Sequence, residues 1–386
     1  MQGNGKFIGV MGSGLIGTDP YAVDAWSGSS RFFFGECDRQ GILERAFGVE
    51  VHKALRAPLM LRNFSPDRDL WRQRFYLDTA YYEALSRAIV ARLTARDQGC
   101  AVLQIGGIYN LRRRLGASRP IYSYHDGNLA TAMKSPQFST RLSPRSVQRA
   151  LDYEREVYQS IDVIFTMSEY LRRSFIEDFG VEPRKVVTIG AGINLEAAPR
   201  WAADKPYDSK KLLFLGADFE RKGGRTLLQA FVTVRAAHPT AELFIVGPRD
   251  LSIPAEHSAG VHNVGFLSKG SEADRGRLET ILREASLFVL PSVYEPFGIA
   301  PLEAMAAGIP AVLTDAWAFP EMVTPGVNGA LVRSGDAADL AAKLIDLLGD
   351  AARLRAMGSA GRQRVLENFT WPRVVNKMRA AMRATG

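Results

Sequence analysis

Short apolar runs alternate with helix-like segments along the whole chain, and this alternation constrains the fold more than any other feature of the sequence. The first series of runs extends from Phe7–Met11 to Val186–Ile189, and a second extends from Lys211–Leu215 to Ala311–Thr314. Amphipathic segments such as Thr79–Ala95 lie between the runs. Strands that alternate with helices form parallel sheets covered by helices on both faces. The sequence therefore predicts an α/β protein.

A stretch without apolar periodicity separates the two series. Asn194–Asp208 carries Pro199 and Pro206 among mixed polar residues, which is typical of a linker. A length of 386 residues also suits two domains better than one. We therefore expect two Rossmann-like domains, residues 1–198 and residues 207–371. Because ligands of open parallel sheets bind beyond the carboxyl ends of the strands, the two sheets should face an interdomain cleft that holds the site.

The composition excludes disordered, fibrous and membrane-spanning proteins. Hydrophobic residues make up 46% of the chain and charged residues 23%, which is the globular range. No apolar run approaches the ~18 residues of a transmembrane helix. Cys37 and Cys100 are too few for a disulfide framework and indicate a reducing compartment. We therefore expect a cytoplasmic protein, in which any contact with the inner face of the membrane is peripheral.

The positive charge is concentrated in one region of the chain. The net charge is +8 overall, but His52–Arg149 alone holds 17 basic and 6 acidic side chains. Arginines interleave there with apolar and aromatic residues, as at Arg56, Leu59, Trp71 and Arg72. Such a region suits an anionic membrane surface or an acidic soluble ligand, and a merely solvated basic surface is the alternative. We expect no nucleic acid partner.

Two glycine-containing turns follow the first predicted strand. Gly12–Gly17 has the spacing G-x-G-x-x-G, but a dinucleotide fingerprint needs a helix that opens at this turn, and Thr18–Ser30 reads as a loop. An NAD-dependent oxidoreductase is therefore disfavoured. Gly28 and Ser29 open a better predicted helix, over Arg31–Gln40, and free N–H groups at a helix start can bind a diphosphate. A plain helix cap is the competing interpretation.

Two motifs with chemical potential follow strands of the second domain. Arg221 and Lys222 come after the first strand, next to glycines that permit close approach, which suits a departing phosphate. Glu295 and Glu303 flank a stretch that is otherwise apolar. Two acids there are costly without partners, and carboxylates accept hydrogen bonds from the vicinal hydroxyls of sugars. These residues are candidates for binding a sugar-containing ligand.

The second half of the chain resembles the family 4 glycosyltransferases, which are retaining enzymes with the GT-B fold. Glu295 and Glu303 match the E-x7-E pattern, and EPFGIAPLEAMAAGIP is similar to the family signature. FLGADFERKGG and PEMVTPGVNGALV are similar to neighbouring segments of the family. The resemblance covers about residues 186–371. One departure is Ala217, which stands where many members have Arg, so the resemblance leaves Arg221 as its substitute.

The resemblance implies a nucleotide-diphosphate-sugar donor, UDP- or GDP-linked, and no other cofactor. Arg221 and Lys222 would hold the diphosphate and Glu303 the ribose hydroxyls. Glu295 would bind the transferred sugar together with the backbone of Phe297 and Gly298. A C-terminal helix, residues 372–386, would cross back to the first domain.

His125 lies at the end of a first-domain strand, where the family has a histidine that points at the donor sugar or the acceptor. A lone histidine is more often structural, but this position beyond a parallel strand favours a site role. Asp67-Arg68-Asp69 is a D-x-D pattern in an irregular basic stretch, which we interpret as a solvated loop rather than a metal site. His257 and His262 have no third ligand nearby, and we predict no metal.

The reaction implied is the retaining, metal-independent transfer of a hexose to a hydroxyl acceptor. The acceptor side depends on the first domain, whose basic region suits a lipid-linked or cell-surface polysaccharide acceptor. A non-catalytic subunit that binds nucleotide sugars is the rival from another class, and the intact set of Glu295, Glu303, Arg221 and Lys222 disfavours it.

Overall fold

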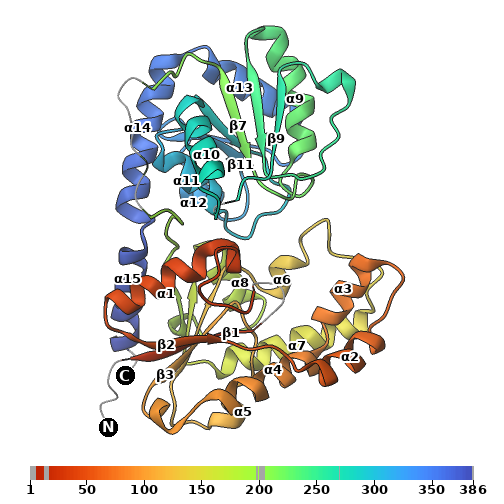
Figure 1. Ribbon diagram of the computed structural model, residues 1–386, viewed down its shortest axis with the longest axis vertical. Coiled ribbons are helices and arrows are strands. Elements are labelled where there is room, and N and C mark those ends of the chain that lie inside the picture. The colour runs from red at the N-terminus through yellow and green to blue at the C-terminus, as the bar shows by residue number, and fades with distance from the viewer. Residues whose placement is uncertain (1–5, 13–16, 197–198, 200–204, 269, 385–386) are drawn as a thin grey trace. The chain divides into compact units, whose positions relative to one another are not determined.

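The computed structural model describes residues 6–12, 17–196, 199, 205–268 and 270–384. It divides into two compact units (Figure 1). Unit 1 comprises Met1–Gly192 together with Trp371–Gly386, and unit 2 comprises Ile193–Thr370. Part of the predicted linker, residues 197–198 and 200–204, lies outside the described residues.

Unit 1 is built on a parallel six-stranded sheet in the order β2-β1-β3-β4-β5-β6. The chain runs from β1 outward to β2 and then returns to the other side of β1, so the strand order reverses between β1 and β3. The strands are β1 (Phe7–Met11), β2 (Leu43–Gly48), β3 (Ala101–Ile105), β4 (Ile121–His125), β5 (Val163–Thr166) and β6 (Val186–Thr188).

Helices cover the sheet of unit 1, and others lie to one side of it (Figure 1). The helices are α1 (Ser29–Arg39), α2 (Lys53–Arg62), α3 (Arg68–Tyr76), α4 (Thr79–Arg92), α5 (Arg112–Leu115), α6 (Leu129–Ala132), α7 (Pro144–Ser160), α8 (Glu169–Glu177) and α15 (Trp371–Ala384). Short 3-10 turns are η1 (Ala25–Gly28), η2 (Ala95–Asp97) and η3 (Pro183–Lys185).

The last helix, α15, belongs to unit 1 although more than 170 residues of unit 2 precede it in the chain. The Trp371 ring lies 5.9 Å from that of Phe33 on α1, and Arg379 Nη1 donates to Gln40 Oε1 at 3.0 Å. Gly192 lacks a Cβ, which would otherwise lie 2.6 Å from the Trp371 ring. The predicted return of the C-terminal helix to the first domain is therefore confirmed.

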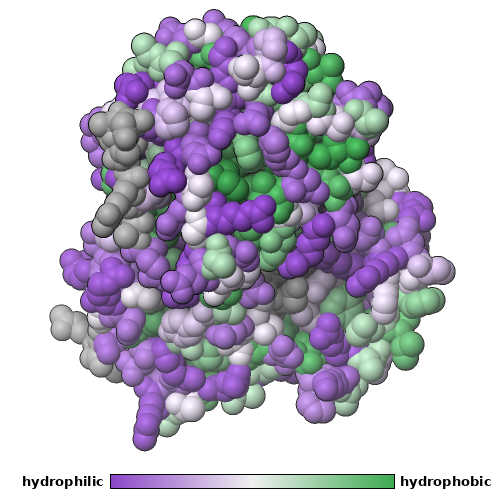
Figure 2. Space-filling view, turned by 45° about the horizontal axis from the view of Figure 1, so that its top comes forward, coloured by the Kyte–Doolittle hydropathy of each residue, from purple (hydrophilic) through white to green (hydrophobic). Residues whose placement is uncertain are grey.

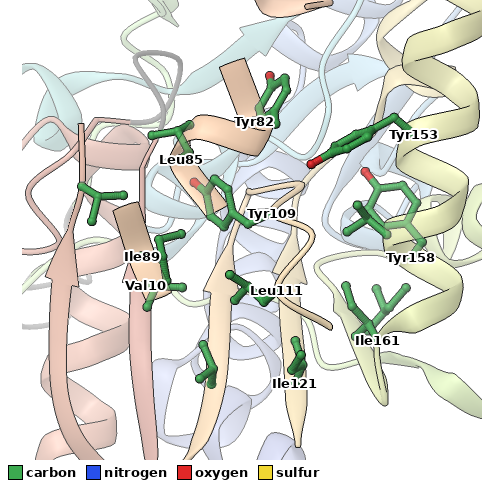
Figure 3. Packing of buried hydrophobic residues seen from close by; sticks show 14 of the residues in the cluster. Val10, Tyr82, Leu85, Ile89, Tyr109, Leu111, Ile121, Tyr153, Tyr158 and Ile161 are labelled. Carbon is green, nitrogen blue, oxygen red and sulfur yellow. The ribbon is translucent and has the colours of Figure 1, made fainter. Parts of the chain in front are cut away.

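The core between the sheet of unit 1 and α4 and α7 combines aliphatic side chains with buried tyrosines (Figure 3). Val10 and Ile121 contribute from the strands, and the rings of Tyr82, Tyr109 and Tyr153 lie among them. Burial raises the pKa of each of these three phenols, so the hydroxyls stay protonated. The core is thus apolar around its strands and carries neutral hydroxyl groups at one end.

Unit 2 has a second parallel six-stranded sheet, in the order β12-β11-β10-β7-β8-β9. The strand order reverses between the adjacent central strands β7 and β10. The strands are β7 (Lys211–Leu215), β8 (Glu242–Val246), β9 (Val261–Gly265), β10 (Leu287–Leu290), β11 (Ala311–Thr314) and β12 (Gly329–Val332). The two units therefore confirm the predicted α/β class with parallel sheets.

Helices lie on both faces of this second sheet (Figure 1). They are α9 (Gly224–Ala237), α10 (Glu272–Glu284), α11 (Ile299–Ala306), α12 (Phe319–Met322), α13 (Ala337–Leu348) and α14 (Ala351–Asn368), with the 3-10 turn η4 (Ala255–His257). Among the residues that the structure describes, no helix is both long and apolar enough to cross a membrane.

Candidate functional site

The candidate site is formed by the loops that leave β7 and β10, the two strands at which the order of sheet 2 reverses. Residues 216–223 connect β7 to α9, and residues 291–298 connect β10 to α11. In open parallel sheets, the crevice between two such loops is where ligands bind, because the loops leave the sheet in opposite directions. The topology therefore brings together the two motifs that the sequence singled out.

Lys222 and Glu295 form a buried ion pair between these loops. Lys222 Nζ donates to Glu295 Oε2 at 2.7 Å, and the two side chains are 13% and 9% exposed. The stem of Lys222 lies flat on Gly216, where an added Cβ would be 2.1 Å from Lys222 Cδ. Since a buried charge is costly without a partner, each residue fixes the other. A ligand phosphate would find this ammonium group already oriented.

Arg221 is used differently from Lys222, although the sequence suggested equivalent roles. Its Nη1 donates to the carbonyl oxygen of Tyr294 at 2.9 Å and lies 3.6 Å from Glu295 Oε2, while its Nε donates to Asp218 Oδ2 at 3.2 Å. The carbonyl oxygen of Arg221 accepts from Val293 N at 2.9 Å. Arg221 thus ties the two loops together and adds positive charge beside Glu295.

Gly223 permits the close approach of these loops. Its φ of +74° is in the left-handed region, and an added Cβ would lie 1.9 Å from the carbonyl oxygen of Pro291. Gly223 is also the N-cap of α9. A side chain at this position would therefore push the β10 loop away from the β7 loop and separate Lys222 from Glu295.

The predicted sugar-binding segment leads into α11. Gly298 has φ +96° and caps α11, and an added Cβ there would meet the Phe319 ring at 2.8 Å and Glu295 Cγ at 3.2 Å. Phe297 is buried with its side chain in the core, so only its backbone is suited to a ligand. Glu303 lies on α11 and is 4% exposed. The structure thus places Glu295 and Glu303 on one continuous loop and helix.

Two aromatic residues beside Glu295 were not predicted. The rings of Tyr294 and Trp317 meet edge to face at 5.1 Å, and Trp317 has φ +62°, which is unusual for a residue other than glycine. Trp317 follows β11, the neighbour of β10. The position of an aromatic residue after a buried strand is the only sequence signal that could have indicated it.

In unit 1, the structure places His125 in the aromatic core. The imidazole is 1% exposed, and its centroid lies 5.5 Å from the ring of Tyr158 and 5.3 Å from that of Phe175. Burial lowers the pKa of His125 to about 3, so the ring is neutral near pH 7. Its Nε2 has no hydrogen-bond partner among the described residues. A role for His125 would therefore use a neutral imidazole.

Glu154 is a second buried titratable group of unit 1, and it was not predicted from the sequence. Its Oε2 accepts from Leu129 N and from the Tyr158 hydroxyl, both at 3.0 Å. Burial raises the pKa of Glu154 to about 7, although these two hydrogen bonds act in the opposite direction. The carboxyl group thereby holds the start of α6, just beyond the loop that follows His125.

The predicted helix start at Gly28 and Ser29 is confirmed, since α1 begins at Ser29 with Gly28 as its N-cap. Trp26, Ser27 and Gly28 have φ values of +47°, +56° and +85° in succession. Such left-handed conformations are costly for Trp and Ser and persist only where the surroundings impose them. Of the G-x-G-x-x-G motif, residues 13–16 lie outside the described residues, and no helix opens in residues 17–24.

The D-x-D pattern is a helix cap rather than the irregular loop that the sequence suggested. Asp67 Oδ1 accepts from Asp69 N and Leu70 N at 3.0 Å each, and Asp67 also pairs with Arg141. These backbone hydrogen bonds and the guanidinium lower the pKa of Asp67. An N-cap aspartate has a non-helical backbone and Pro66 precedes it here, so the local sequence of this helix start looks like that of a loop. Within the described residues, no group of three or more His, Cys, Asp or Glu side chains could hold a metal ion.

Comparison with known proteins decides the family. The model of the family described as "Glycosyl transferases group 1" matches residues 197–364. A GDP-mannose-dependent monoacylated alpha-(1-6)-phosphatidylinositol monomannoside mannosyltransferase from Corynebacterium glutamicum is 30% identical over 278 residues, which cover 67% of this chain and 68% of that protein. The chain belongs to the group 1 glycosyl transferases.

Two other curated relatives match a smaller part of this glycosyl transferase. An alpha-maltose-1-phosphate synthase from Mycolicibacterium smegmatis is 32% identical over 248 residues, 58% of this chain and 63% of that protein. An MMP alpha-(1->4)-mannosyltransferase from Mycolicibacterium hassiacum is 29% identical over 229 residues, 58% of this chain and 54% of that protein. The chain thus spans between about half and two thirds of the length of these three relatives.

Solved structures show that the fold of this glycosyl transferase is GT-B. A sucrose-phosphate synthase from Thermosynechococcus elongatus matches with a TM-score of 0.72 and 19% identity, and the match covers 98% of each chain. WaaG, described as a glycosyltransferase involved in lipopolysaccharide biosynthesis, matches with a TM-score of 0.64 and 15% identity over 98% of this chain and 100% of that one. The predicted GT-B fold is therefore confirmed.

Proposed function

We propose that this glycosyl transferase moves a hexose from a nucleotide-diphosphate sugar to a hydroxyl acceptor with retention of the anomeric configuration. The observation that carries the proposal is the buried Lys222–Glu295 pair at the point where the strand order of unit 2 reverses. We further propose that the chain is a family 4 enzyme in which Glu295 and Glu303 are the two acids of the E-x7-E motif.

The donor is held mainly by unit 2 in this proposal. Lys222 binds the diphosphate, and Arg221 adds charge while it secures the loop. Glu303 accepts hydrogen bonds from the ribose hydroxyls. The backbone N–H groups around Phe297 and Gly298, at the open start of α11, bind the transferred sugar together with Glu295.

Both residues of the Lys222–Glu295 pair contact the donor when it binds. A diphosphate that approaches Lys222 Nζ competes with Glu295 for the ammonium group, because both are anionic. Glu295 Oε2 then becomes available to accept a hydrogen bond from a sugar hydroxyl. The pair is thus a preformed donor site in which the carboxylate occupies the place of the phosphate charge.

In the chemical step, the bond between the anomeric carbon and the diphosphate oxygen breaks, and a bond from the anomeric carbon to the acceptor oxygen forms on the same face. The acceptor proton passes to the departing diphosphate oxygen. Lys222 stabilises the negative charge that develops on this oxygen, in the manner of an oxyanion site. The step needs no metal ion and no strongly basic side chain.

Unit 1 contributes two further proposed contacts. The N–H groups beside Gly28 and Ser29 at the start of α1 bind the diphosphate, which the dipole of this eleven-residue helix favours. His125 Nε2, as a neutral group without a partner among the described residues, hydrogen-bonds a sugar or acceptor hydroxyl. The nucleotide is UDP or GDP: one relative is named as GDP-mannose-dependent, and a structural neighbour was solved with UDP and glucose.

The acceptor is proposed to be lipid-linked or part of a cell-surface polysaccharide. One relative is named for a phosphatidylinositol monomannoside acceptor, and WaaG is named for lipopolysaccharide biosynthesis. The basic region His52–Arg149 supports peripheral contact with an anionic membrane. The cytoplasmic location expected from the sequence stays a prediction, and Cys37 and Cys100 are free and buried.

A panel of ligands tests the proposal against both rivals. Thermal shift measurements with UDP-, GDP-, ADP- and CDP-sugars and with NAD should show stabilisation by one or two nucleotide sugars and none by NAD. NMR of the product anomer should then show the same configuration as the donor. Stabilisation by NAD alone would contradict the proposal. Tight donor binding without hydrolysis or transfer to any acceptor would support the non-catalytic subunit instead.

A further inference from the structure

The exposed surface of α2 carries apolar residues beside the exposed Lys53 and Arg56, whereas a surface helix usually exposes mainly polar residues. No residue of this ten-residue helix is buried. Ala54, Pro58 and Leu61 follow one another at intervals of four and three positions and are all exposed. Leu55 is 60% exposed and Leu61 76%, the highest value among the large apolar side chains that the structure describes as exposed. Exposed leucines at this density on a short helix indicate a surface that contacts something other than water.

Phe64 extends the apolar surface beyond the end of α2. It is 58% exposed, and its ring meets that of Trp71 on α3 at 5.6 Å. Trp71 Nε1 donates to the carbonyl oxygen of Met60 at 2.9 Å, which ties α3 to α2. We call Leu55, Leu61 and Phe64 the α2 patch. The patch is therefore carried by two connected helices.

The surroundings of the α2 patch are positively charged. Residues 52–76 contain six Lys or Arg and two Asp. One of the acids, Asp67, is already engaged as the cap of α3 and with Arg141. Four basic residues are exposed and form no ion pair with any residue that the structure describes: Lys53, Arg56, Arg68 and Arg72. The apolar patch is thus bordered by cations that lack a counter-charge.

We propose that the α2 patch docks the protein on an anionic lipid bilayer. Leu55, Leu61 and Phe64 enter the boundary between headgroups and acyl chains, and the bordering cations contact lipid phosphates. This combination fits a lipid surface, because its headgroups are anionic and its interior is apolar. The inference rests on the proposed function only in that a lipid-linked acceptor gives the contact a purpose.

Two other occupants fit less well. A second copy of the chain would bring two sets of unpaired cations together, and like charges at an interface are unfavourable. An acidic soluble ligand would use the cations but would leave the leucines in water.

Figure 2 shows hydrophobic and hydrophilic side chains side by side near the right-hand edge of unit 1, where Figure 1 places α2 and α3.

Vesicle co-sedimentation tests the docking without any donor or acceptor. The full chain should pellet with vesicles of phosphatidylcholine and phosphatidylglycerol at equal parts in low salt, and should stay in solution with pure phosphatidylcholine. Binding should fall as salt increases. No pelleting with the anionic vesicles would overturn the proposal. Because nucleotide binding is measured separately by calorimetry, failure here leaves the glycosyl transfer proposal untouched, and the reverse also holds.

Leu61→Glu and Leu55→Glu test the apolar part of the patch. Each should weaken vesicle binding about tenfold or more, because the proposed contact of a leucine with the lipid is replaced by a charge. Val232→Glu is the matched control, since Val232 is 46% exposed on α9 of unit 2. Neither leucine is buried, so both variants should keep the wild-type circular dichroism and Tm. Equal vesicle binding by the wild type and both folded leucine variants would overturn the proposal.

Arg56→Glu tests the charged border, with Lys343→Glu on α13 as the control at an exposed helical position. The first variant should weaken binding about tenfold, because it replaces an attraction to the lipid by a repulsion, and the second should not change it. Light scattering adds a decisive readout. If the wild type is a dimer and Leu61→Glu makes it a monomer, the patch is an interface between copies and the lipid proposal is wrong.

Discussion

The two units have similar sheets but differ in how they use titratable groups at the carboxyl ends of their strands. In unit 2, the loops after β7 and β10 hold a buried ion pair, Lys222 with Glu295. In unit 1, the buried groups near the end of β4 are His125, which burial keeps neutral, and Glu154, whose pKa burial raises to about 7. Unit 1 carries its charge on the outside, around α2 and α3.

This difference shows that two units with similar sheets can carry different chemical groups at the ends of their strands. A parallel sheet offers a crevice where its strand order reverses, and the loops decide what the crevice can bind. In unit 2 the loops supply a charge pair that a diphosphate can enter. In unit 1 the segment before α1 supplies a left-handed turn, and aromatic rings from α7 and α8 surround the neutral His125. We therefore expect donor chemistry mainly in unit 2 and surface contact in unit 1.

Lys222→Ala should produce the largest loss. We expect kcat to fall on the order of 100-fold or more, because the cation that we propose to stabilise the departing diphosphate is removed. Steady-state kinetics with the donor found in the ligand panel measures this fall in kcat. Arg225→Ala is the control, since Arg225 lies on the same segment and pairs with Glu220 at the surface. A wild-type rate in Lys222→Ala would move the chemistry away from this pair.

Gly223→Ala should disrupt unit 2 through the backbone. We expect a loss of about 2–4 kcal/mol in the free energy of unfolding, from the left-handed φ and from the clash with the Pro291 carbonyl. Gly41→Ala in unit 1 separates these causes, because Gly41 has a similar φ of +71° but open space around it. Denaturant unfolding of both variants measures the difference. Equal losses would mean that close approach of the two loops contributes nothing.

Glu303→Ala should raise the donor KM about tenfold or more with a smaller change in kcat, because hydrogen bonds from the ribose to a charged group are lost. Steady-state kinetics over a range of donor concentrations separates the two constants. Glu279→Ala on exposed α10 is the control. If calorimetry shows unchanged donor affinity in Glu303→Ala, the ribose contact is wrong.

Glu154→Gln should have the smallest effect, and one that depends on pH. The folded-state pKa of about 7 exceeds the ordinary value of 4.5, so the native state binds more protons and wild-type stability falls as pH rises from about 4.5 to 7. Glutamine does not ionise, so the variant should gain on the order of 1–2 kcal/mol relative to the wild type between pH 5 and 8. Unfolding at both pH values measures this gain.

A difference between variant and wild type that stays constant with pH would contradict the raised pKa of Glu154.

The variant His125→Leu should show the opposite dependence of stability on pH. The folded-state pKa of His125 is about 3, below its ordinary 6.5, so the wild type loses stability as pH falls from about 6.5 toward 3, and the leucine variant should not.

Most of the fold could be predicted from the sequence, except for three strands. β2, β9 and β12 all lie at the edges of their sheets. Central strands are buried on both faces and read as continuous apolar runs, whereas an edge strand such as Val261–Gly265 keeps polar residues, here His262 and Asn263, that face solvent. The pattern that reveals a buried strand is therefore absent at β9, but not at every edge, because β6, the other edge strand of unit 1, was predicted from its apolar residues.

The residues of the candidate site could also be predicted, but the contacts between them and their burial could not. Glu295, Lys222 and Glu303 stand out because charged residues follow or interrupt apolar segments. The different uses of Arg221 and Lys222 depend on which atoms of the β10 loop face each side chain. The neutral state of His125 likewise depends on Tyr158 and Phe175, which lie far along the chain from it. Pairing and burial across long separations are not encoded in local patterns.

We propose that unit 2 supplies most of the binding energy for the donor diphosphate. Calorimetric titration of the nucleoside diphosphate that binds the wild type best, into Lys222→Ala and Gly28→Ala, compares the two units directly. We expect that Lys222→Ala weakens binding about tenfold or more and that Gly28→Ala weakens it less. Stronger weakening in a folded Gly28→Ala, with affinity unchanged in Lys222→Ala, would contradict the claim.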